Sequence, residues 1–479
     1  MSVLDQLEPN KVFRYFEQLC AIPHGSRNTK AVSDWCVAFA RERGLEHYQD
    51  AFHNVIIIQE ATPSYEAAEP VILQGHLDMV CEKEPGCPKD MEREGLDLVV
   101  EDGFVIARGT TLGGDDGIAV AMALAILDNA SIPHPRLEVV LTTEEEIGML
   151  GAAALDVSPL RGCQLLNLDS EAEGVFTVGC AGGSLTKCTL PVHREPFAGE
   201  TLRLTVSGLT GGHSGAEIHQ GRANANLLLG RLLRAMAAVT ELRLVSAAGG
   251  AKDNAIPVAA EAVVTIADGA AARAAFTALA EQLKKEYRVT DPALEVTVTD
   301  TTAAELPMDG DSTCRALCFL TCAPNGVQEM SREIPGLVQT SLNLGILGTG
   351  AGELSAAFCV RSSVASQKEM LHDRLRCLTE ALGGTVDISG NYPAWEYRPD
   401  SALQERMTEV FWEQYGYEPK IEAIHAGVEC GLLCGKLPDL DCVSIGPDLE
   451  EIHTPRERMS VASVQRVWAF VLEVLKRSK

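Results

Sequence analysis

Histidine and carboxylate residues recur in this sequence just after short apolar runs or at the start of an Ala-rich stretch. The set comprises His76, Asp78, Asp115, Glu144–Glu146, Asp169 and His453. Imidazole and carboxylate groups are the ligands that zinc and similar divalent ions take in proteins. Carboxylates can also bridge two ions, which two-metal hydrolases hold about 3.5–4 Å apart. The residue types therefore predict a divalent-metal site that activates water for hydrolysis.

Each of these residues has an ordinary structural alternative. Asp115 could cap a helix, Glu144–Glu146 could be a solvated acidic run, and Asp169 could be a turn residue. His76 with Asp78 could be a surface or capping pair. Their joint occurrence, each at an expected strand end or helix start, favours the metal site over these separate explanations.

The first part of the chain alternates strand and helix patterns. Strands are expected at residues 53–59, 71–73, 137–141 and 165–168, and helices at residues 12–20, 32–42 and 117–129. Apolar strands separated by helices predict an α/β fold, with a mostly parallel sheet and helices on both faces. Ligands bind at the carboxyl ends of the strands in such sheets. The polar residues that follow the strands should therefore share one edge.

A second block has a different pattern, with alternating strands beside a few long helices. Strands are expected at residues 201–207, 262–266, 294–298, 339–346 and 355–360, and helices at 224–239, 271–286 and 367–381. This pattern predicts an α+β domain with helices on one face of an antiparallel sheet. The α/β pattern then resumes, with helices at 401–415 and 460–476 and strands at 420–423 and 442–445. We expect a catalytic domain formed by residues 1–188 and 391–479, interrupted by an inserted domain, 189–390.

Composition excludes several classes of function. The 479 residues carry 40 Lys and Arg against 67 Asp and Glu, a formal net charge of −27. This balance argues against nucleic-acid binding and against docking on anionic lipid. No apolar stretch reaches the ~18–20 residues of a membrane span. Without a visible secretory signal, we expect a cytoplasmic protein whose 15 cysteines are reduced.

Longer motifs surround the candidate residues. They are Gln74–Val80, Thr111–Gly117, Glu144–Gly148, Asn167–Glu171, Gly211–Gly215 and Glu451–His453. In these motifs, and over essentially its whole length, the sequence resembles the clan of co-catalytic di-zinc aminopeptidases, aminoacylases and carboxypeptidases. Within the clan it is most similar to the aminoacyl-histidine dipeptidases, which hydrolyse Xaa-His dipeptides including carnosine. The resemblance implies a dipeptidase that acts on small unblocked dipeptides.

The resemblance also implies a ligand for each of two divalent ions, zinc in the first place, with manganese or cobalt as alternatives. His76 and Asp169 would bind one ion, Glu146 and His453 would bind the other, and Asp115 would bridge both. The resemblance, matched residue by residue, is what assigns these five residues as metal ligands.

Two further residues acquire catalytic roles from the same resemblance. Asp78 would orient the imidazole of His76, and Glu145 would be the general base that takes a proton from the attacking water. The family pattern places the base and then the ligand directly before an apolar residue and a glycine. That pattern selects Glu145 and Glu146 and leaves Glu144 as a flanking residue.

The inserted block would supply the substrate side of the site. By resemblance, His213 stabilises the tetrahedral oxyanion, Asn254 binds substrate, and Arg361 clamps the terminal carboxylate of the dipeptide. Arginine suits this task because its planar fork pairs with a carboxylate through two hydrogen bonds. Gly427 would offer backbone contacts. The resemblance further implies that this block is a lid and dimerisation domain, and that the protein is a homodimer.

The sequence departs from the family pattern at one position and leaves two alternatives open. Family members commonly have Ala-Asp-Asn where this chain has Gly114-Asp115-Asp116, so an extra carboxylate stands beside the proposed bridge. An N-acyl amino acid deacylase would use the same metal centre. A non-catalytic scaffold is disfavoured because Asp78 and Glu145, which are not ligands, are both present.

Overall fold

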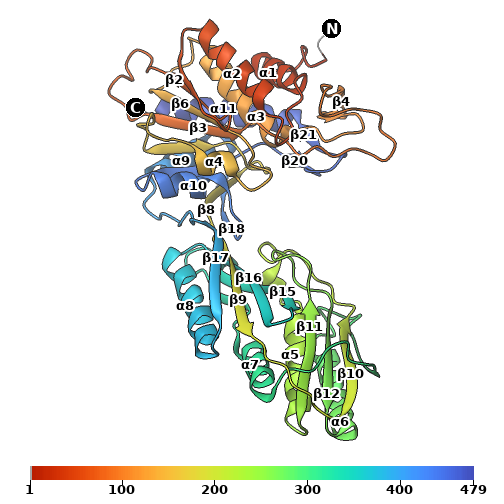
Figure 1. Cartoon of the computed structure of the whole chain (residues 1–479). Coiled ribbons are helices and arrows are strands. Elements are labelled where there is room, and N and C mark those ends of the chain that lie inside the picture. The colour runs from red at the N-terminus through yellow and green to blue at the C-terminus, as the bar shows by residue number, and fades with distance from the viewer. Residues whose placement is uncertain (1–2) are drawn as a thin grey trace. The chain divides into compact units, whose positions relative to one another are not determined.

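The computed structural model describes residues 3–479, which form two compact units (Figure 1). Within these described residues, unit 1 consists of residues 3–179, 397–423 and 428–479, and unit 2 consists of residues 180–396 and 424–427. The two ends expected for the inserted domain, at residues 188 and 391, fall within strands β9 (Gly182–Pro191) and β17 (Thr385–Tyr392). Both strands belong to the sheet of unit 2, so they enter that unit as whole elements.

Unit 1 is built on an eight-stranded sheet with the order β1-β2-β6-β3-β7-β19-β8-β18. The strands are β1 (Glu46–Gln49), β2 (Val55–Gln59), β3 (Val71–His76), β6 (Leu137–Thr142), β7 (Gln164–Asn167), β8 (Val175–Cys180), β18 (Lys420–Ile424) and β19 (Asp441–Ser444). The neighbours β6, β3, β7 and β19 pair in parallel, whereas β1 with β2, β2 with β6, and β19 with β8 pair antiparallel. The expected α/β class is confirmed, with a sheet that is parallel at its centre and antiparallel towards its edges.

The central strands are buried on both faces. Every residue of β3 and of β6 is buried. Because successive side chains of a strand point to opposite faces, both faces must be covered. The helices of this unit are α1 (Asn10–Cys20), α2 (Lys30–Glu42), α3 (Gly114–Leu127), α4 (Leu150–Ala154), α9 (Ala402–Tyr415), α10 (Glu429–Lys436) and α11 (Val461–Arg477). Helix α3 is apolar on all sides and packs against α1 and β3.

A small four-stranded sheet was not expected from the sequence. Its order is β20-β21-β5-β4, with β4 (Leu98–Glu101), β5 (Phe104–Ala107), β20 (Leu449–Glu450) and β21 (Arg458–Ser460). Strand β21 pairs antiparallel with both β20 and β5. The turn between β20 and β21 contains His453, so pairing across more than 300 residues of sequence fixes the base of that turn.

Unit 2 contains a nine-stranded antiparallel sheet with helices packed against it. Eight strands follow the order β13-β10-β12-β11-β15-β16-β9-β17, and β14 pairs with β15. Besides β9 and β17, the strands are β10 (Glu200–Ser207), β11 (Leu242–Gly249), β12 (Ala260–Ile266), β13 (Glu295–Asp300), β14 (Gly326–Met330), β15 (Val338–Thr349) and β16 (Glu353–Ser362). The helices are the short 3₁₀ helix η1 (Ile218–Gln220), α5 (Ala225–Ala237), α6 (Gly269–Glu286), α7 (Gly310–Cys322) and α8 (Ala365–Ala381).

The expected elements of unit 2 are all present, whereas strands β9, β11, β14 and β17 and helix α7 were not expected from the sequence. The core packs the inward residues of the sheet, such as Leu204 and Val264, against α5 residues such as Leu229. Helix α5 begins at a true cap, since the side chain of Asn224 accepts hydrogen bonds from the backbone N–H groups of Asn226 and Leu227. Among residues 3–479, the structure has no helix with the length and apolarity that crossing a membrane requires.

Candidate metal centre and active site

His76 is the last residue of β3, at the carboxyl end of the parallel strands. Its Nδ1 lies 2.9 Å from the backbone carbonyl oxygen of Asp78. A carbonyl can only accept, so Nδ1 carries the proton and Nε2 is the nitrogen free to bind a cation. The preceding residue must be glycine, because a Cβ at Gly75 would lie 2.5 Å from Oδ2 of Asp116 and 2.6 Å from Cβ of Ala119. Strand β3 therefore packs so closely against α3 at this point that no side chain fits between them.

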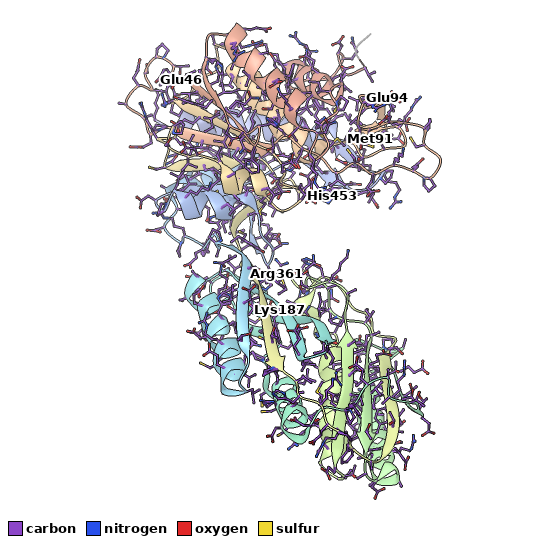
Figure 2. All side chains as sticks on the ribbon, viewed as in Figure 1. Glu46, Met91, Glu94, Lys187, Arg361 and His453 are labelled. Carbon is purple, nitrogen blue, oxygen red and sulfur yellow. The ribbon has the colours of Figure 1, made fainter. Side chains whose placement is uncertain are left out.

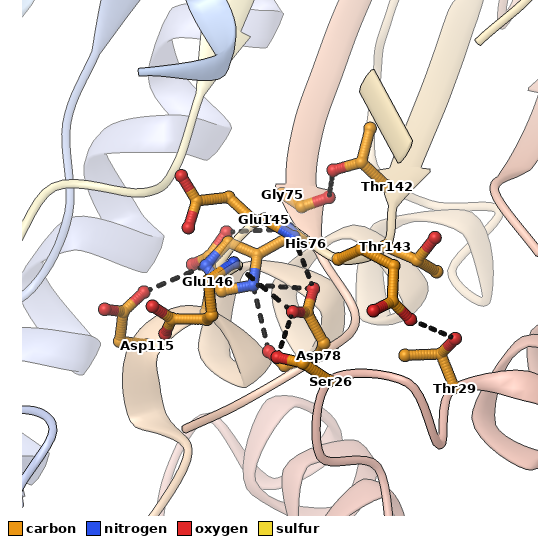
Figure 3. Close-up of polar contacts among 12 residues, drawn as sticks. Ser26, Thr29, Gly75, His76, Asp78, Asp115, Thr142, Thr143, Glu145 and Glu146 are labelled. Carbon is orange, nitrogen blue, oxygen red and sulfur yellow. Dashed lines mark hydrogen bonds and ion pairs between the residues drawn. The ribbon is translucent and has the colours of Figure 1, made fainter. Parts of the chain in front are cut away.

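Asp115 lies between two histidines that come from opposite ends of the chain. Its Oδ1 is 3.1 Å from Nε2 of His76 (Figure 3), and its Oδ2 is 3.1 Å from Nε2 of His453. The backbone of Asp115 is not helical, with φ −83° and ψ 105°, so its side chain is displayed ahead of the regular turns of α3. One carboxylate thus offers one oxygen to each side, which is what a bridging ligand needs.

Glu146 and Asp169 complete the two sides. Oε1 of Glu146 is 2.9 Å from Nε2 of His453, and Oδ1 of Asp169 is 3.6 Å from Nε2 of His76. Asp169 follows β7, and Glu146 lies in the loop that follows β6, so the carboxyl ends of neighbouring strands bring both residues to the same edge. The structure therefore brings together all five residues expected as ligands.

The atom spacings fit divalent ions. Two donors 2.0–2.1 Å from a tetrahedral zinc ion stand about 3.3 Å apart, and the donor pairs described above span 2.9–3.6 Å. Ligand atoms within 4.8 Å of one another also occur in three overlapping triads, which are His76, Asp116 and Asp169; His76, Glu145 and Glu146; and Asp115, Glu146 and His453. The second carboxylate of the Asp115-Asp116 pair thus lies near one ion position.

Several carboxyl groups lie close together at this edge, and burial raises the pKa values of two of them. Burial raises the pKa of Asp169 to about 7, and nearby Asp115 adds to the rise, while His76 opposes it. Burial, with the charges of Asp169 and Asp115 adding to it, also holds the pKa of Asp116 well above its usual range. Oδ2 of Asp116 accepts a hydrogen bond from the backbone N–H of His76 at 3.1 Å. Bound cations would neutralise this excess of negative charge.

Asp78 holds the turn that carries the glutamates. Its Oδ1 accepts from the backbone N–H of Glu145 at 3.0 Å, and its Oδ2 accepts from that of Glu146 at 3.3 Å and from Oγ of Ser26 at 2.8 Å. The carboxylate is 3.6 Å from Nδ1 of His76, further away than the carbonyl oxygen of the same residue. The side chain of Asp78 thus orients the glutamate turn more directly than the imidazole.

Glu145 is partly buried beside the proposed ligands. Burial raises the pKa of its carboxyl well above the usual range; the charge of His76 opposes this rise, while Asp169, Glu429 and Glu146 add to it. A carboxyl group in such surroundings accepts a proton readily, as a general base must.

Glu144 faces away from the metal centre. Both of its oxygens accept from the backbone N–H of Arg27, at 2.9 and 2.8 Å, and one also accepts from Oγ1 of Thr29 at 3.2 Å. It thereby ties the loop before α2 to the loop after β6. This structural role was not expected from the sequence.

In unit 2, His213 is held in one tautomer. Its Nδ1 accepts hydrogen bonds from the backbone N–H groups of Ala216 at 3.0 Å and Gly215 at 3.3 Å. Burial lowers its pKa, and the nearby Arg361 lowers it further. The imidazole is therefore neutral, with its proton on Nε2, and Nε2–H is available as a donor.

Arg361 lies next to His213. It is 8% exposed, its Nη1 donates to the hydroxyl of Tyr392 at 3.0 Å, and its buried Nε has no partner among the described residues. Gly215 separates the two side chains: a Cβ there would lie 3.0 Å from Cε1 of His213, 3.1 Å from Nε of Arg361 and 2.5 Å from the carbonyl oxygen of His425. A free guanidinium edge beside a neutral imidazole suits an anionic ligand.

Asn254 and Gly427 also lie in unit 2. The carbonyl oxygen of Asn254 accepts from the backbone N–H of Ser214 at 2.9 Å, and Asn254 and His213 line the same cavity of about 650 Å³. Gly427 is half-buried, two residues after His425, whose Nε2 is 2.7 Å from Oγ of Ser341. The sequence reading missed Tyr392 and Ser341, since only the folded sheet brings them to Arg361 and His425.

Comparison with known proteins places this geometry in a family. The chain matches peptidase family M20/M25/M40 over residues 72–477. It is 36% identical over 483 aligned positions to a cytosol non-specific dipeptidase of Escherichia coli (strain K12), covering 99% of both chains.

Solved structures agree with that match. The fold superposes with a TM-score of 0.93 on an aminoacylhistidine dipeptidase from Vibrio alginolyticus, at 35% identity, covering 99% of this chain and 97% of the other. An aminopeptidase from Bacillus cereus, at 15% identity and a TM-score of 0.56, covers 98% of this chain and 99% of its own and shares the fold alone. On the family match and this full-length likeness, the chain belongs to peptidase family M20/M25/M40.

Proposed function

We propose that the protein is a two-metal dipeptidase that hydrolyses unblocked dipeptides, Xaa-His dipeptides and carnosine-like substrates among them, in the cytoplasm. The observation that carries the proposal is the position of Asp115, whose two oxygens each lie 3.1 Å from a different histidine nitrogen. Two full-length relatives whose names specify a dipeptidase support the substrate class. Zinc is the ion we propose first, with manganese and cobalt as alternatives.

In this proposal, His76 and Asp169 hold one ion, Glu146 and His453 hold the other, and Asp115 holds both. When bound, the ions would acidify a water molecule and polarise the scissile carbonyl. Glu145 accepts the proton of the attacking water. Asp78 fixes the backbone of Glu145 and thereby keeps base and ligand facing different ways.

The residues of unit 2 would act on the substrate. The neutral imidazole of His213 offers its Nε2–H to the oxygen that becomes negative as the carbonyl is attacked. Arg361 offers its guanidinium to the terminal carboxylate, and the hydrogen bond from its Nη1 to the hydroxyl of Tyr392 holds the planar group in place. We further propose that Asn254 and Gly427 line the substrate, that unit 2 serves as a lid and that the protein is a homodimer.

A cleft of about 690 Å³ in unit 1 favours substrates with a free amino end over N-acylated substrates. It borders Glu146 and is lined by Arg27, Glu82, Glu92, Met91 and Ile147, among others. Of this lining, Figure 2 labels Met91. An acyl chain would need a wholly apolar wall, whereas this wall combines apolar side chains such as Met79 and Met91 with charged side chains of both signs. The carboxylates of Glu82 and Glu92 can attract an α-ammonium group. This chemistry favours a dipeptidase over the N-acyl amino acid deacylase.

A matched substrate set tests the proposal. Ala-His, its N-acetyl form and its C-terminal amide would be assayed with the purified protein after dialysis against zinc, manganese or cobalt. We expect the free dipeptide to be cleaved at least ten times faster than either blocked form. Preferred cleavage of the N-acetyl form would instead establish the deacylase. No cleavage of any substrate with any of the three ions would refute both enzymes.

A further inference from the structure

A buried carboxylate outside the proposed ligand set connects the loop before Asp115 to the turn that carries His453. Glu457 is 3% exposed. Its Oε2 accepts from the backbone N–H groups of Leu112 at 2.8 Å and Gly113 at 3.1 Å, and its Oε1 accepts from that of Gly114 at 2.8 Å. Three successive N–H groups immediately before Asp115 therefore converge on one side chain.

The loop that precedes Asp115 depends on this side chain. Gly113 has a left-handed backbone, with φ 68° and ψ 31°, and no side chain of the helix start caps α3. Buried N–H groups that lack an acceptor are costly, and a carboxylate at a helix start is also favoured by the helix dipole. Glu457 supplies both the acceptor and the charge.

The other end of the connection is the turn that carries His453. Glu451 and His453 both have positive φ, 54° and 58°, which are backbone conformations that only well-supported turns maintain. The backbone N–H of Glu457 donates to the carbonyl oxygen of Thr454 at 3.0 Å, which closes this turn, and β21 follows directly. Glu457 thus fixes the turn at the point where it leaves His453.

Glu146 is positioned independently of this arrangement. Its loop is anchored by Asp78, and among residues 3–479 the side chain of Glu457 makes its hydrogen bonds to Leu112, Gly113 and Gly114 rather than to that loop. Of the three residues around the ion position next to His453, two depend on Glu457. Around the other position, His76 and Asp169 are fixed by β3 and β7, and only the shared Asp115 depends on Glu457.

We propose that Glu457 is a positioning residue that sets the affinity of the ion held by Asp115, Glu146 and His453, an inference that rests on the proposed two-metal centre. It does not touch the ions or the substrate. Its carboxylate holds the bridging aspartate and the histidine at the distance that a shared ion requires.

Glu457→Gln tests this proposal because it preserves size while removing the charge and one acceptor oxygen. In the Gln variant, the amide NH₂ group would face backbone N–H groups that it cannot accept hydrogen bonds from. Glu138→Gln is the matched control: Glu138 is a fully buried carboxylate of unit 1 that accepts from the backbone N–H groups of Arg161 and Gly162 at 2.8 and 3.0 Å. It lies at the other end of β6 from the glutamate loop. Zn²⁺ binding would be followed by competition with a chromophoric chelator and by elemental analysis after dialysis, with Co²⁺ absorption as a second readout.

We expect the parent protein to bind two ions and Glu138→Gln to bind two ions with unchanged affinity at a lower Tm. Glu457→Gln should keep one ion and bind the second at least tenfold more weakly, with an altered Co²⁺ spectrum. Glu457→Asp, which keeps the charge on a shorter arm, should restore part of the affinity, and it replaces the Gln variant if that fails to fold. If the Glu457 variants bind both ions as tightly as the parent protein, the inference about Glu457 is wrong but the proposed metal centre stands. The same conclusion follows if the affinity falls equally at both ion positions. A parent protein that binds fewer than two ions refutes the proposed metal centre as well.

Discussion

Three adjacent glutamates have three different surroundings. Glu146 faces His453, Glu145 lies partly buried among the proposed ligands, and Glu144 accepts hydrogen bonds from the loop before α2. The difference arises because Asp78 fixes the backbone N–H groups of two of them, and Glu144 has a positive φ of 58° that turns its side chain away. Identical side chains can therefore take the proposed roles of ligand and base and the observed role of tether.

The first prediction separates base from tether. Glu145→Gln should lower kcat about 10²–10⁴-fold, because a general base contributes that much, while the protein keeps two ions. Glu144→Gln should keep most of kcat and lower Tm, because it loosens the tether to Arg27 and Thr29. Steady-state kinetics, elemental analysis and thermal unfolding of both variants check this. Loss of an ion from the Glu145 variant would show that Glu145 is a ligand and reverse its assignment with Glu146.

The second prediction concerns Arg361. Arg361→Ala should reduce kcat/KM for Ala-His by roughly 10–150-fold, since a hydrogen bond to a charged group is worth about 1.5–3 kcal/mol. The rate on the C-terminal amide should change much less, because the amide offers no carboxylate to the guanidinium. Tyr392→Phe is a control, since it removes only the hydroxyl that accepts from Nη1. An equal loss on dipeptide and amide would argue against a carboxylate clamp.

At the scale of elements, the carboxyl ends of parallel strands bring together the residues of the proposed metal centre. Strands β3, β6 and β7 are neighbours, and His76, the glutamate loop and Asp169 follow them in turn. The β20–β21 turn adds His453 from a separate small sheet, and the start of α3 adds Asp115. The proposed ligands thus lie at or just beyond the ends of strands and at the start of a helix, where the elements behind them can hold side chains in place.

The third prediction tests the packing of the substrate-side loop in unit 2. Gly215→Ala places a methyl group 2.5 Å from the carbonyl oxygen of His425 and close to both His213 and Arg361. We expect kcat/KM to fall at least tenfold, with metal content unchanged, because the change lies outside unit 1. Gly352→Ala is the control, since nothing lies within 4 Å of a Cβ at that glycine and its φ is not positive. Comparable losses in both variants would show that the effect is not local to residue 215.

At the scale of the whole molecule, the proposed metal-binding residues and the proposed substrate-binding residues belong to different units. All five proposed ligands and Glu145 belong to unit 1, whereas His213, Asn254, Arg361 and Gly427 belong to unit 2. Each unit has its own sheet and its own core. Binding of ions should therefore stabilise one unit and leave the other unchanged.

The fourth prediction follows from that division. Ions at about a hundred times their Kd stabilise the folded state by about 2.7 kcal/mol, which corresponds to roughly 5–11 °C in Tm for a domain of this size. Removing them with a chelator should abolish activity and lower the thermal transition of unit 1 by that amount. Differential scanning calorimetry, with limited proteolysis to assign the transitions, is the measurement. Full activity in protein verified to be metal-free, or an equal shift of both transitions, would contradict the proposal.

Local features of the sequence predicted much of the centre. The apolar runs before His76 and Asp169 form strands because they are long enough and apolar enough to be buried on both faces, and parallel strands necessarily end at one edge. The Ala-rich stretch after Asp115 forms a buried helix for the same reason. The α/β class and the inserted antiparallel block also follow from periodicity, which depends only on neighbouring residues.

Other features were decided by the tertiary structure alone. Strands β4, β5, β20 and β21 are too short to stand out in the sequence, yet their pairing fixes the turn of His453. Glu457 contacts residues more than 340 positions earlier, and Arg361 meets Tyr392 across a sheet. No local pattern specifies these contacts, because their free energy depends on groups that become neighbours only when distant segments pack together and exclude water.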